Sequence, residues 1–573
     1  MNVHFDPRAW LIAVVALAFA GCTATPVKKD APPASAGKSQ AANQPEAGDD
    51  DLLAQMLAGE FAIGQSDIAA AAVRYGNAAR LSKDPQVSAQ AARLALAARN
   101  YSLAREMLAR WRTLKPEDPG LLQVEAGLAM GGGDAEAAFA ALQKLLPLPN
   151  EQGWRYLGQT LLGAADKPMA AALLERLATP ANLAAASEDI WIAMSQLAFK
   201  LDRKAYSRTL ADAAVQKFSG GPSFGWSAQL AADEGDKRRA IALYKEAIQR
   251  SPKDIRMRAG YALLLSEEGD HRGAAKVLAD GPQDEYTYAA RAAYVARSED
   301  EKLVQALFDE MKALPEEQSA AHADLLGQLA ELLEQPAIAL TWYQKVSEDD
   351  DNWFDAQVRI AVIEDQQGKH DAALTLTHDL QARVGDDPKR LADAFLLEGE
   401  LLIHAGKDDA VQEAYSRGIK LLPTDTRLIY ARALHAANIG RVDDAERDLR
   451  RVLELKPSDV DAMNALGYTL ADANRKLDEA LSLIERALKA KPEEPAVIDS
   501  LGWVRYRRGE LAEAETALKR AFDKQPDAEI AAHYGEVLWH NGKREEARKV
   551  LGEARKKDDK NKSLLETMKR LGL

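Results

Sequence analysis

The chain has 573 residues, which is enough for several ordinary domains or for one long repeat array. Hydrophobic residues make up 47% of it and aromatic residues only 6%, a balance that favours helices over strands. The 74 basic and 88 acidic residues give a net charge of −14, which argues against a general nucleic-acid-binding protein.

Residues 1–21 have the organisation of an export signal. The apolar run Ala9–Ala20 is too short to span a bilayer comfortably but suits the core of a signal peptide. The run leads into Phe-Ala-Gly-Cys, and Cys22 is the only cysteine of the chain. This ending resembles a bacterial lipobox, in which the cysteine thiol is lipidated and becomes the mature N-terminus. The alternatives are an uncleaved anchor or an ordinary signal with an incidental cysteine.

The lipobox resemblance implies an outer-membrane lipoprotein that faces the periplasm and is held by lipid on Cys22. Thr23 follows the cysteine, and lipoproteins without Asp at that place are sent to the outer membrane by the rule of that family. Residues 22–50 are rich in Pro, Ala, Ser and Gly and lack the apolar content for a core, so we expect a lipidated cysteine followed by a flexible linker.

From residue 51 to residue 573 small residues recur at steps that are mostly 33 to 35 residues long. In many of these repeats a glycine stands five residues earlier, where we expect one helix to end and the chain to turn. The small residues are Ala71, Ala104, Ala138, Ala170, Ala205, Ala240, Ala274, Ala306, Ala339, Ala373, Ala445, Ala480, Ala514 and Ala547, and Val411 fills the gap between Ala373 and Ala445 with slightly irregular spacing. The glycines are Gly133, Gly235, Gly269, Gly368, Gly406, Gly440, Gly509 and Gly542.

One repeat carries a fuller pattern, in which Leu501-Gly502 is followed by Ala514, then Ala521, then Pro526. This resembles the tetratricopeptide repeat (TPR), W-x2-L-G-x2-Y, then A-x3-F, then P, over about 34 residues. The resemblance implies an all-α fold in which residues 51–573 form an α-solenoid superhelix of about fifteen TPR-like helix pairs. Gly502 and Ala514 are expected where the two helices of a pair cross.

Aromatic residues gather on one predicted helix face near the C-terminus. Asp499, Trp503 and Tyr506 are spaced i, i+4 and i+7, and in TPR proteins this face lines the concave groove. Neighbouring repeats place further residues at the matching positions. We interpret the set as a partner-binding surface, because Trp, Tyr and Arg often carry interface energy; the alternative is that the rings pack under an adjacent helix. The set is Asn464, Tyr468, Asp499, Trp503, Tyr506, Arg507, Glu536, Trp539 and His540.

No pattern in the sequence indicates catalysis, a cofactor or a metal. The zinc-protease, P-loop and nucleophile-elbow motifs are absent from the sequence, and so is any cysteine pair. His533 and His540 are seven residues apart with no carboxylate in register, so we expect them to be structural or surface residues. We therefore do not expect an enzyme.

Three C-terminal runs, 464–472, 499–506 and 529–539, resemble a group of long proteobacterial TPR lipoproteins. The group includes the lipoprotein partner of the periplasmic carboxyl-terminal processing protease. The resemblance implies a membrane-anchored scaffold that binds proteins and holds such a protease near its substrates, the peptidoglycan hydrolases. The rival interpretation is a structural scaffold of an envelope assembly, such as exopolysaccharide export or pilus biogenesis. The sequence leaves open which partners bind and whether the chain self-associates.

Overall fold

The computed structural model describes residues 51–573. The predicted signal peptide, Cys22 and the linker lie outside the described residues. Within the described part, the regular structure consists of 32 α-helices and one short 3-10 helix, with no strand. The predicted all-α repeat solenoid is therefore confirmed, and the helix count agrees with about fifteen pairs. No helix between residues 51 and 573 has the length and apolar character required to cross a bilayer.

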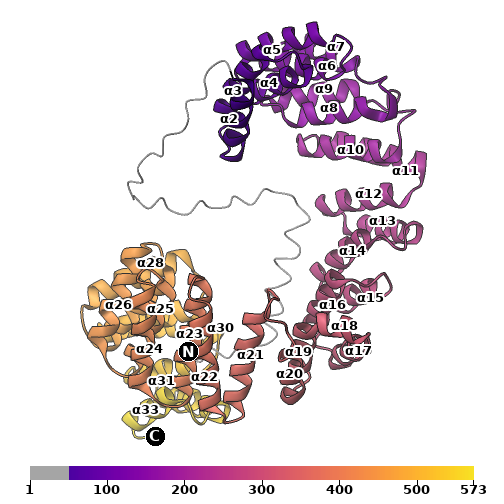
Figure 1. Cartoon of the computed structure of the whole chain (residues 1–573). Coiled ribbons are helices and arrows are strands. Elements are labelled where there is room, and N and C mark those ends of the chain that lie inside the picture. The colour runs from indigo at the N-terminus through magenta and orange to yellow at the C-terminus, as the bar shows by residue number, and fades with distance from the viewer. Residues whose placement is uncertain (1–50) are drawn as a thin grey trace. The chain divides into compact units, whose positions relative to one another are not determined.

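The chain divides into two compact units, one ending at Leu307 and the other running from Phe308 to Leu573. In the first unit (indigo to magenta in Figure 1), successive helices pack as pairs. Its helices are α2 (Leu52–Gly64), α3 (Ile68–Leu81), α4 (Pro85–Ala97), α5 (Tyr101–Leu114), α6 (Gly120–Gly131), α7 (Ala135–Gln143), η2 (Pro149–Glu151), α8 (Gln152–Leu162), α9 (Lys167–Leu177), α10 (Glu188–Lys200), α11 (Lys204–Phe218), α12 (Gly221–Asp233), α13 (Lys237–Arg250), α14 (Ile255–Glu267), α15 (His271–Ala279) and α16 (Glu285–Ser298).

The boundary between the units falls within α17 (Glu301–Lys312). The second unit continues the same pairing to the C-terminus, where the ribbon is yellow in Figure 1. Its further helices are α18 (Glu316–Ala321), α19 (Ala323–Leu332), α20 (Pro336–Tyr343), α21 (Trp353–Gln366), α22 (His370–Arg383), α23 (Pro388–His404), α24 (Asp408–Leu421), α25 (Thr426–Asn438), α26 (Val442–Leu455), α27 (Val460–Asp472), α28 (Leu477–Ala490), α29 (Pro495–Arg507), α30 (Leu511–Lys524), α31 (Ala528–His540), α32 (Arg544–Lys557) and α33 (Lys562–Leu571).

Local chemistry fixes where the helices begin and end. The carboxylates of Asp84, Asp425 and Asp459 accept hydrogen bonds from the first turns of α4, α25 and α27, a cap worth roughly 1 kcal/mol each. All eight glycines predicted at the turns have positive φ, between +64° and +82°. Residues with a Cβ disfavour that conformation, so the predicted turn positions are confirmed.

The close helix crossings are also confirmed in most repeats. A Cβ on Gly502 would lie 2.4 Å from Leu518 Cγ, and Ala514 is fully buried. The predictions for Ala205 and Ala306 are wrong, because both residues are exposed. In α11 the buried residue is Ser207, whose carbonyl accepts a 2.6 Å hydrogen bond from the Ser195 hydroxyl.

In α17 the residues on either side of Ala306 are buried instead, among them Val304, Leu307 and Phe308. The close approach in α11 therefore lies two residues later than the average period predicts, whereas in α17 the buried face excludes Ala306.

Candidate partner-binding surface

The predicted partner-binding residues come from the first helices of three successive pairs, α27, α29 and α31. Pro495 occupies the first turn of α29, and the Asp527 carboxylate caps α31 by accepting from Ile530 N at 2.8 Å. Helix α29 packs against both α27 and α31. Side chains separated by one repeat in sequence are therefore brought side by side.

Five rings form a continuous series across these three helices, and we call them the aromatic cluster. The imidazole of His533 is at its centre, stacked on Trp503 with 4.2 Å between ring centroids. On one side of His533 lies the ring of Tyr468, with 5.8 Å between the two centroids. On the other side the series continues from Trp503 to Tyr506, with centroids 5.1 Å apart, and from Tyr506 to His540, with centroids 5.7 Å apart. Ring pairs in this distance range are worth about 0.5–1.5 kcal/mol each beyond their burial.

A buried acid–imidazole pair holds the centre of the aromatic cluster. His533 Nδ1 and Asp499 Oδ2 are 2.8 Å apart, and both residues are about 95% buried or more. Burial lowers the pKa of His533, but the Asp499 carboxylate outweighs this effect and the pKa lies above its ordinary value. The other imidazole nitrogen, Nε2, lies 3.3 Å from the Tyr468 hydroxyl. The pair thus joins all three helices.

Two side chains of α29 bind the C-terminal end of α27. The Trp503 indole donates to Asp472 Oδ1 at 3.2 Å, and the Arg507 guanidinium donates to the carbonyls of Ala471 and Asp472 at 3.2 and 2.7 Å. A cation is favourable there because the last carbonyls of a helix carry partial negative charge. Arg507 therefore has a structural role, and its guanidinium also lies over the Trp503 ring.

Glu536 connects the aromatic cluster to the last helix, α33. Its carboxylate accepts from Arg570 at 2.6 Å and from the Tyr506 hydroxyl at 3.4 Å. Burial, followed by the Glu536 charge, raises the pKa of Tyr506 to about 12. The Tyr506 hydroxyl therefore stays protonated at neutral pH and donates toward Glu536.

The structure brings most of the predicted residues together, but Trp539 contacts another helix and, among the described residues, no hydrogen bond or ring contact joins Asn464 to the cluster. Trp539 lies against α32, with the guanidinium groups of Arg544 and Arg548 5.2 and 5.4 Å from its ring centroid. Asn464 is half-buried on α27, and its Oδ1 has no hydrogen-bond partner among the described residues. The residues that meet are Tyr468, Asp499, Trp503, Tyr506, Arg507, Glu536 and His540.

The members of the aromatic cluster differ in how accessible they are. Trp503 is only 3% exposed, so this ring packs inside the protein, as the alternative interpretation expects. Tyr468 and Tyr506 are half-buried, and His540 is exposed. Only the outer members of the cluster can contact a partner without rearrangement, and partner binding itself remains a prediction.

His533, the central ring of the aromatic cluster, was not among the residues predicted for the partner-binding surface. No carboxylate was expected in register with this histidine, but Asp499 stands 34 residues earlier, on the first helix of the preceding pair. That separation equals the repeat period, so Asp499 and His533 occupy matching positions in successive repeats. A comparison of matching positions is the sequence signal that could have identified the pair.

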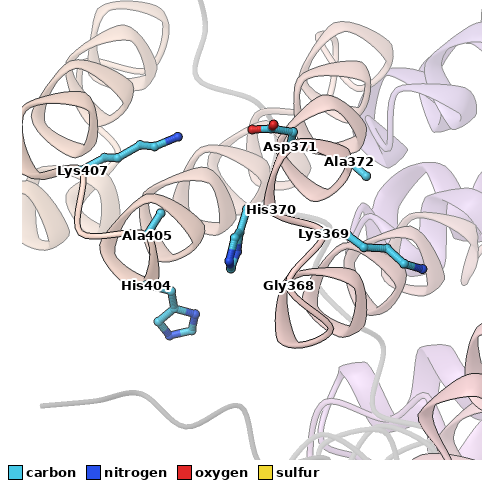
Figure 2. Close-up of a pocket in the computed structure, with 8 residues that line it drawn as sticks. All are labelled: Gly368, Lys369, His370, Asp371, Ala372, His404, Ala405 and Lys407. Carbon is cyan, nitrogen blue, oxygen red and sulfur yellow. The ribbon is translucent and has the colours of Figure 1, made fainter.

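A second polar feature in the same unit is a shallow depression of about 500 Å³, shown in Figure 2. Two of its lining residues, His370 and His404, come from α22 and α23, and their Nδ1 atoms lie 2.6 and 3.2 Å from the buried Asp365 carboxylate. Lys369 and Lys407 also line it. Residues 51–573 hold no group of three or more His, Cys, Asp or Glu arranged to bind a metal.

Known protein families that match this chain are built from helix pairs of the same kind. Tetratricopeptide repeat models match residues 430–495 and 500–562, which include the aromatic cluster, and residues 231–297. The chain contains tetratricopeptide repeats. Helical repeats of this kind commonly form extended protein-binding surfaces.

The chain is also similar to curated proteins over part of its length. It is 37% identical over 217 residues to the TPR repeat-containing protein PA4667 of Pseudomonas aeruginosa, covering 38% of this chain and 36% of that protein. It is 30% identical over 131 residues to the cellulose synthase operon protein C of Pseudomonas fluorescens, covering 22% of this chain and 10% of that protein. The chain thus spans well under half the length of either relative.

Among solved structures, the pentatricopeptide repeat protein PPR10 from maize is similar, with a TM-score of 0.55 and 12% sequence identity. The likeness covers 91% of this chain and 81% of the maize protein. At this identity it shows the helical-repeat fold alone.

Proposed function

We propose that this chain is a lipid-anchored scaffold on the periplasmic side of the outer membrane, and that it recruits a processing protease and its peptidoglycan-hydrolase substrates. The lipobox-like ending before Cys22 supports the anchor. The resemblance of residues 464–539 to proteobacterial TPR lipoproteins supports the choice of partners. Binding both partners to one scaffold would raise the concentration of each near the other.

The observation that carries the proposal is the aromatic cluster. Its buried core of Asp499, Trp503 and His533 fixes the outer rings, Tyr506 and His540, in defined positions at the surface. A partner peptide would meet rings that are already ordered, so little conformational entropy is lost on binding. Exposed and half-exposed aromatic residues on a rigid support have the composition of interface hot spots.

The proposal is tested by crosslinking the full-length protein in its membranes, capturing it and identifying the bound proteins by mass spectrometry. The informative variant is Tyr506→Ala, because Tyr506 is half-buried and its loss leaves the Asp499–His533 pair in place. The matched control is Tyr156→Ala, a half-buried tyrosine of α8 whose hydroxyl accepts from Gln152 at 2.9 Å. We expect a protease and wall hydrolases with the parent and the control, and at least about tenfold less of both with Tyr506→Ala, since a hot-spot residue contributes about 2 kcal/mol or more.

A second candidate is a structural scaffold of an envelope assembly. It is favoured by the partial similarity to the cellulose synthase operon protein C. In that case the same capture yields components of a polysaccharide-export or pilus machine in a stable complex, and no protease. Recovery of such components would overturn the protease proposal, and a catch unaffected by Tyr506→Ala would remove the aromatic cluster from the binding surface.

A further inference from the structure

Two rings of the aromatic cluster share a hydrogen bond whose direction depends on a single proton. Nε2 of His533 lies 3.3 Å from the Tyr468 hydroxyl, and Nδ1 of the same ring lies 2.8 Å from Asp499 Oδ2. An ionised carboxylate can only accept, so Nδ1 carries a hydrogen whether the imidazole is neutral or charged. Nε2 is therefore the atom that gains or loses the proton when His533 titrates.

The hydrogen bond between Tyr468 and His533 has opposite directions in the two states. The charged imidazole donates from Nε2–H to the Tyr468 oxygen, and the hydroxyl hydrogen is then free for another acceptor. The neutral imidazole has a lone pair on Nε2, so the Tyr468 hydroxyl donates to it and has no hydrogen left to offer. Uptake of one proton from solvent thus releases one hydrogen-bond donor on Tyr468.

The charged groups around His533 favour uptake of that proton. Three carboxylates act on the imidazole, from Asp499 on α29, Glu529 on α31 itself and Asp472 on α27. Burial lowers the pKa of His533, but these carboxylates outweigh burial and the pKa lies above its ordinary value. The face of the Trp503 indole, stacked at 4.2 Å, also favours a cation. His533 is therefore charged below about pH 6.5 and becomes neutral as the pH rises through its raised pKa.

Cations on the helices that pack around α31 are engaged with other groups. They are Arg507 of α29 with the last carbonyls of α27, Arg520 of α30 with Glu493, Arg544 of α32 with the ring of Trp539, and Arg570 of α33 with Glu536. The field at the imidazole is therefore set mainly by the three carboxylates.

Tyr468 keeps its own hydrogen over the same pH range. Burial, followed by the charges of Asp472, Glu529 and Asp499, raises the pKa of Tyr468 well above its ordinary value, and Arg507 offsets only part of this effect. Tyr468 is also half-buried, so part of the side chain reaches the surface. Its hydroxyl is therefore always protonated, and the state of His533 decides whether that hydrogen is available.

We propose that Tyr468 is a pH-switched donor of the partner-binding surface, offered to a carbonyl or carboxylate oxygen of a bound polypeptide when His533 is charged and withdrawn when His533 is neutral. The inference rests on the proposed function, because it takes this surface as the partner site. One hydrogen bond gained or lost changes an affinity by about two- to tenfold. Partner binding is therefore stronger in acid and weakens as His533 loses its proton.

NMR of the full-length protein in detergent tests the switch without a partner, with nitrogen-15 in histidine and carbon-13 at the ζ-carbon of tyrosine. The Tyr468 signal is the one that Tyr468→Phe removes, and the His533 signals are those in contact with the Trp503 ring. Tyr430→Phe identifies a control signal, from a half-buried tyrosine of α25 outside the aromatic cluster. We expect Tyr468 and Nε2 of His533 to titrate with one midpoint above about pH 6.5, a transition that Tyr430 does not share.

Three NMR results would overturn the switch. The first is a His533 that stays charged up to about pH 9.5, because the donor is then never withdrawn. The second is an Nδ1 that loses its hydrogen in place of Nε2. The third is a Tyr468 signal that does not follow the titration of His533, because the hydroxyl then has the same acceptor in both states.

Capture at two pH values tests the effect on partners. Photocrosslinking in membranes at about pH 6 and about pH 9 is carried out with the parent, Tyr468→Phe and the control Tyr430→Phe. We expect about two- to tenfold more partner at the lower pH with the parent and the control, and a smaller ratio with Tyr468→Phe. The same pH dependence in all three proteins would overturn the role of Tyr468. Absence of protease and hydrolases at both pH values would instead contradict the proposed function, and the NMR titration would still decide the switch.

Discussion

At the residue scale, the most informative group is the buried pair of Asp499 and His533. Removing one partner of a buried ion pair leaves the other uncompensated, at a cost on the order of 3 kcal/mol. The pair also has a pH signature, because its carboxylate raises the pKa of the imidazole in the folded state. A group whose pKa is raised in the folded state stabilises the fold. Its contribution to the free energy of unfolding is complete below the unfolded-state pKa and is lost as the pH rises through the folded-state pKa.

We predict that Asp499→Asn lowers the free energy of opening of α29 and α31, and that the loss is larger at about pH 6 than at about pH 9. Hydrogen exchange of peptides from these two helices measures the effect locally. Asp478→Asn is the control, since Asp478 is 96% exposed beside Arg508 and its surface pair contributes little. A loss that is equal at the two pH values would show that His533 is not protonated in the fold.

Helical periodicity was sufficient to place Asp499, Trp503 and Tyr506 in one group, because a spacing of four and three residues fixes a common face. It could not predict that Trp503 is covered. The covering ring belongs to His533, and only the stacking of the next pair places it 4.2 Å from the indole. The position of Trp539 was also beyond periodicity, because Arg544 and Arg548 of the following helix hold its ring.

At the element scale, repeated contacts connect one helix pair to the next. Arg441 donates to Asp409 at 2.6 Å, and Arg475 donates to Asp443 at 2.7 Å, in each case across one repeat. These pairs are exposed, so each adds little to the free energy of unfolding. The tight helix crossings contribute more to the free energy of unfolding. The helices are in such close contact there that an added side-chain atom would force them apart.

We predict that Gly502→Ala destabilises the pair α29–α30 by about 1–3 kcal/mol, because the new Cβ would lie 2.4 Å from Leu518 Cγ and 3.1 Å from its backbone nitrogen. Gly552→Ala in α32 is the opposite case, since nothing lies within 4 Å of its Cβ position. Alanine is the better helix former there and should stabilise by about 0.5–1 kcal/mol. Urea unfolding of the two variants checks both signs, and a Gly502→Ala protein as stable as the parent would contradict the crossing.

The same comparison shows what a period can and cannot predict. Turn glycines such as Gly509, with φ +82°, were predictable because few other residues tolerate that conformation. Ala205 and Ala306 were misplaced because a small residue is required only where helices touch. The close approach in α11 lies at Ser207, and Ala306 lies on the exposed side of α17. The average period therefore loses the register where a helix pair is irregular.

At the scale of the whole molecule, location decides which partners the scaffold can meet. We predict that Cys22→Ser moves the protein from the membrane fraction to the soluble fraction, because a lipid anchor adds about 0.8 kcal/mol per buried CH₂. Thr23→Asp should leave the protein membrane-bound but shift it from the outer to the inner membrane. Separation of the two membranes on a density gradient measures both results. A Cys22→Ser protein that stays with membranes would indicate an uncleaved N-terminal anchor.

The hydrogen bond between Tyr468 and His533 bears on how such an array can evolve. Repeat arrays lengthen and shorten when whole repeats are duplicated or deleted, and an array held only by nearest-neighbour contacts tolerates such events. Tyr468 and His533 lie 65 residues apart, with the entire pair α29–α30 between them in sequence. Duplication of that helix pair would keep the same kinds of contact between neighbouring pairs. It would nevertheless move Tyr468 and His533 apart and break this hydrogen bond. We therefore expect the three pairs from α27 to α32 to be inherited together as one block, while the repeats before them are free to change in number.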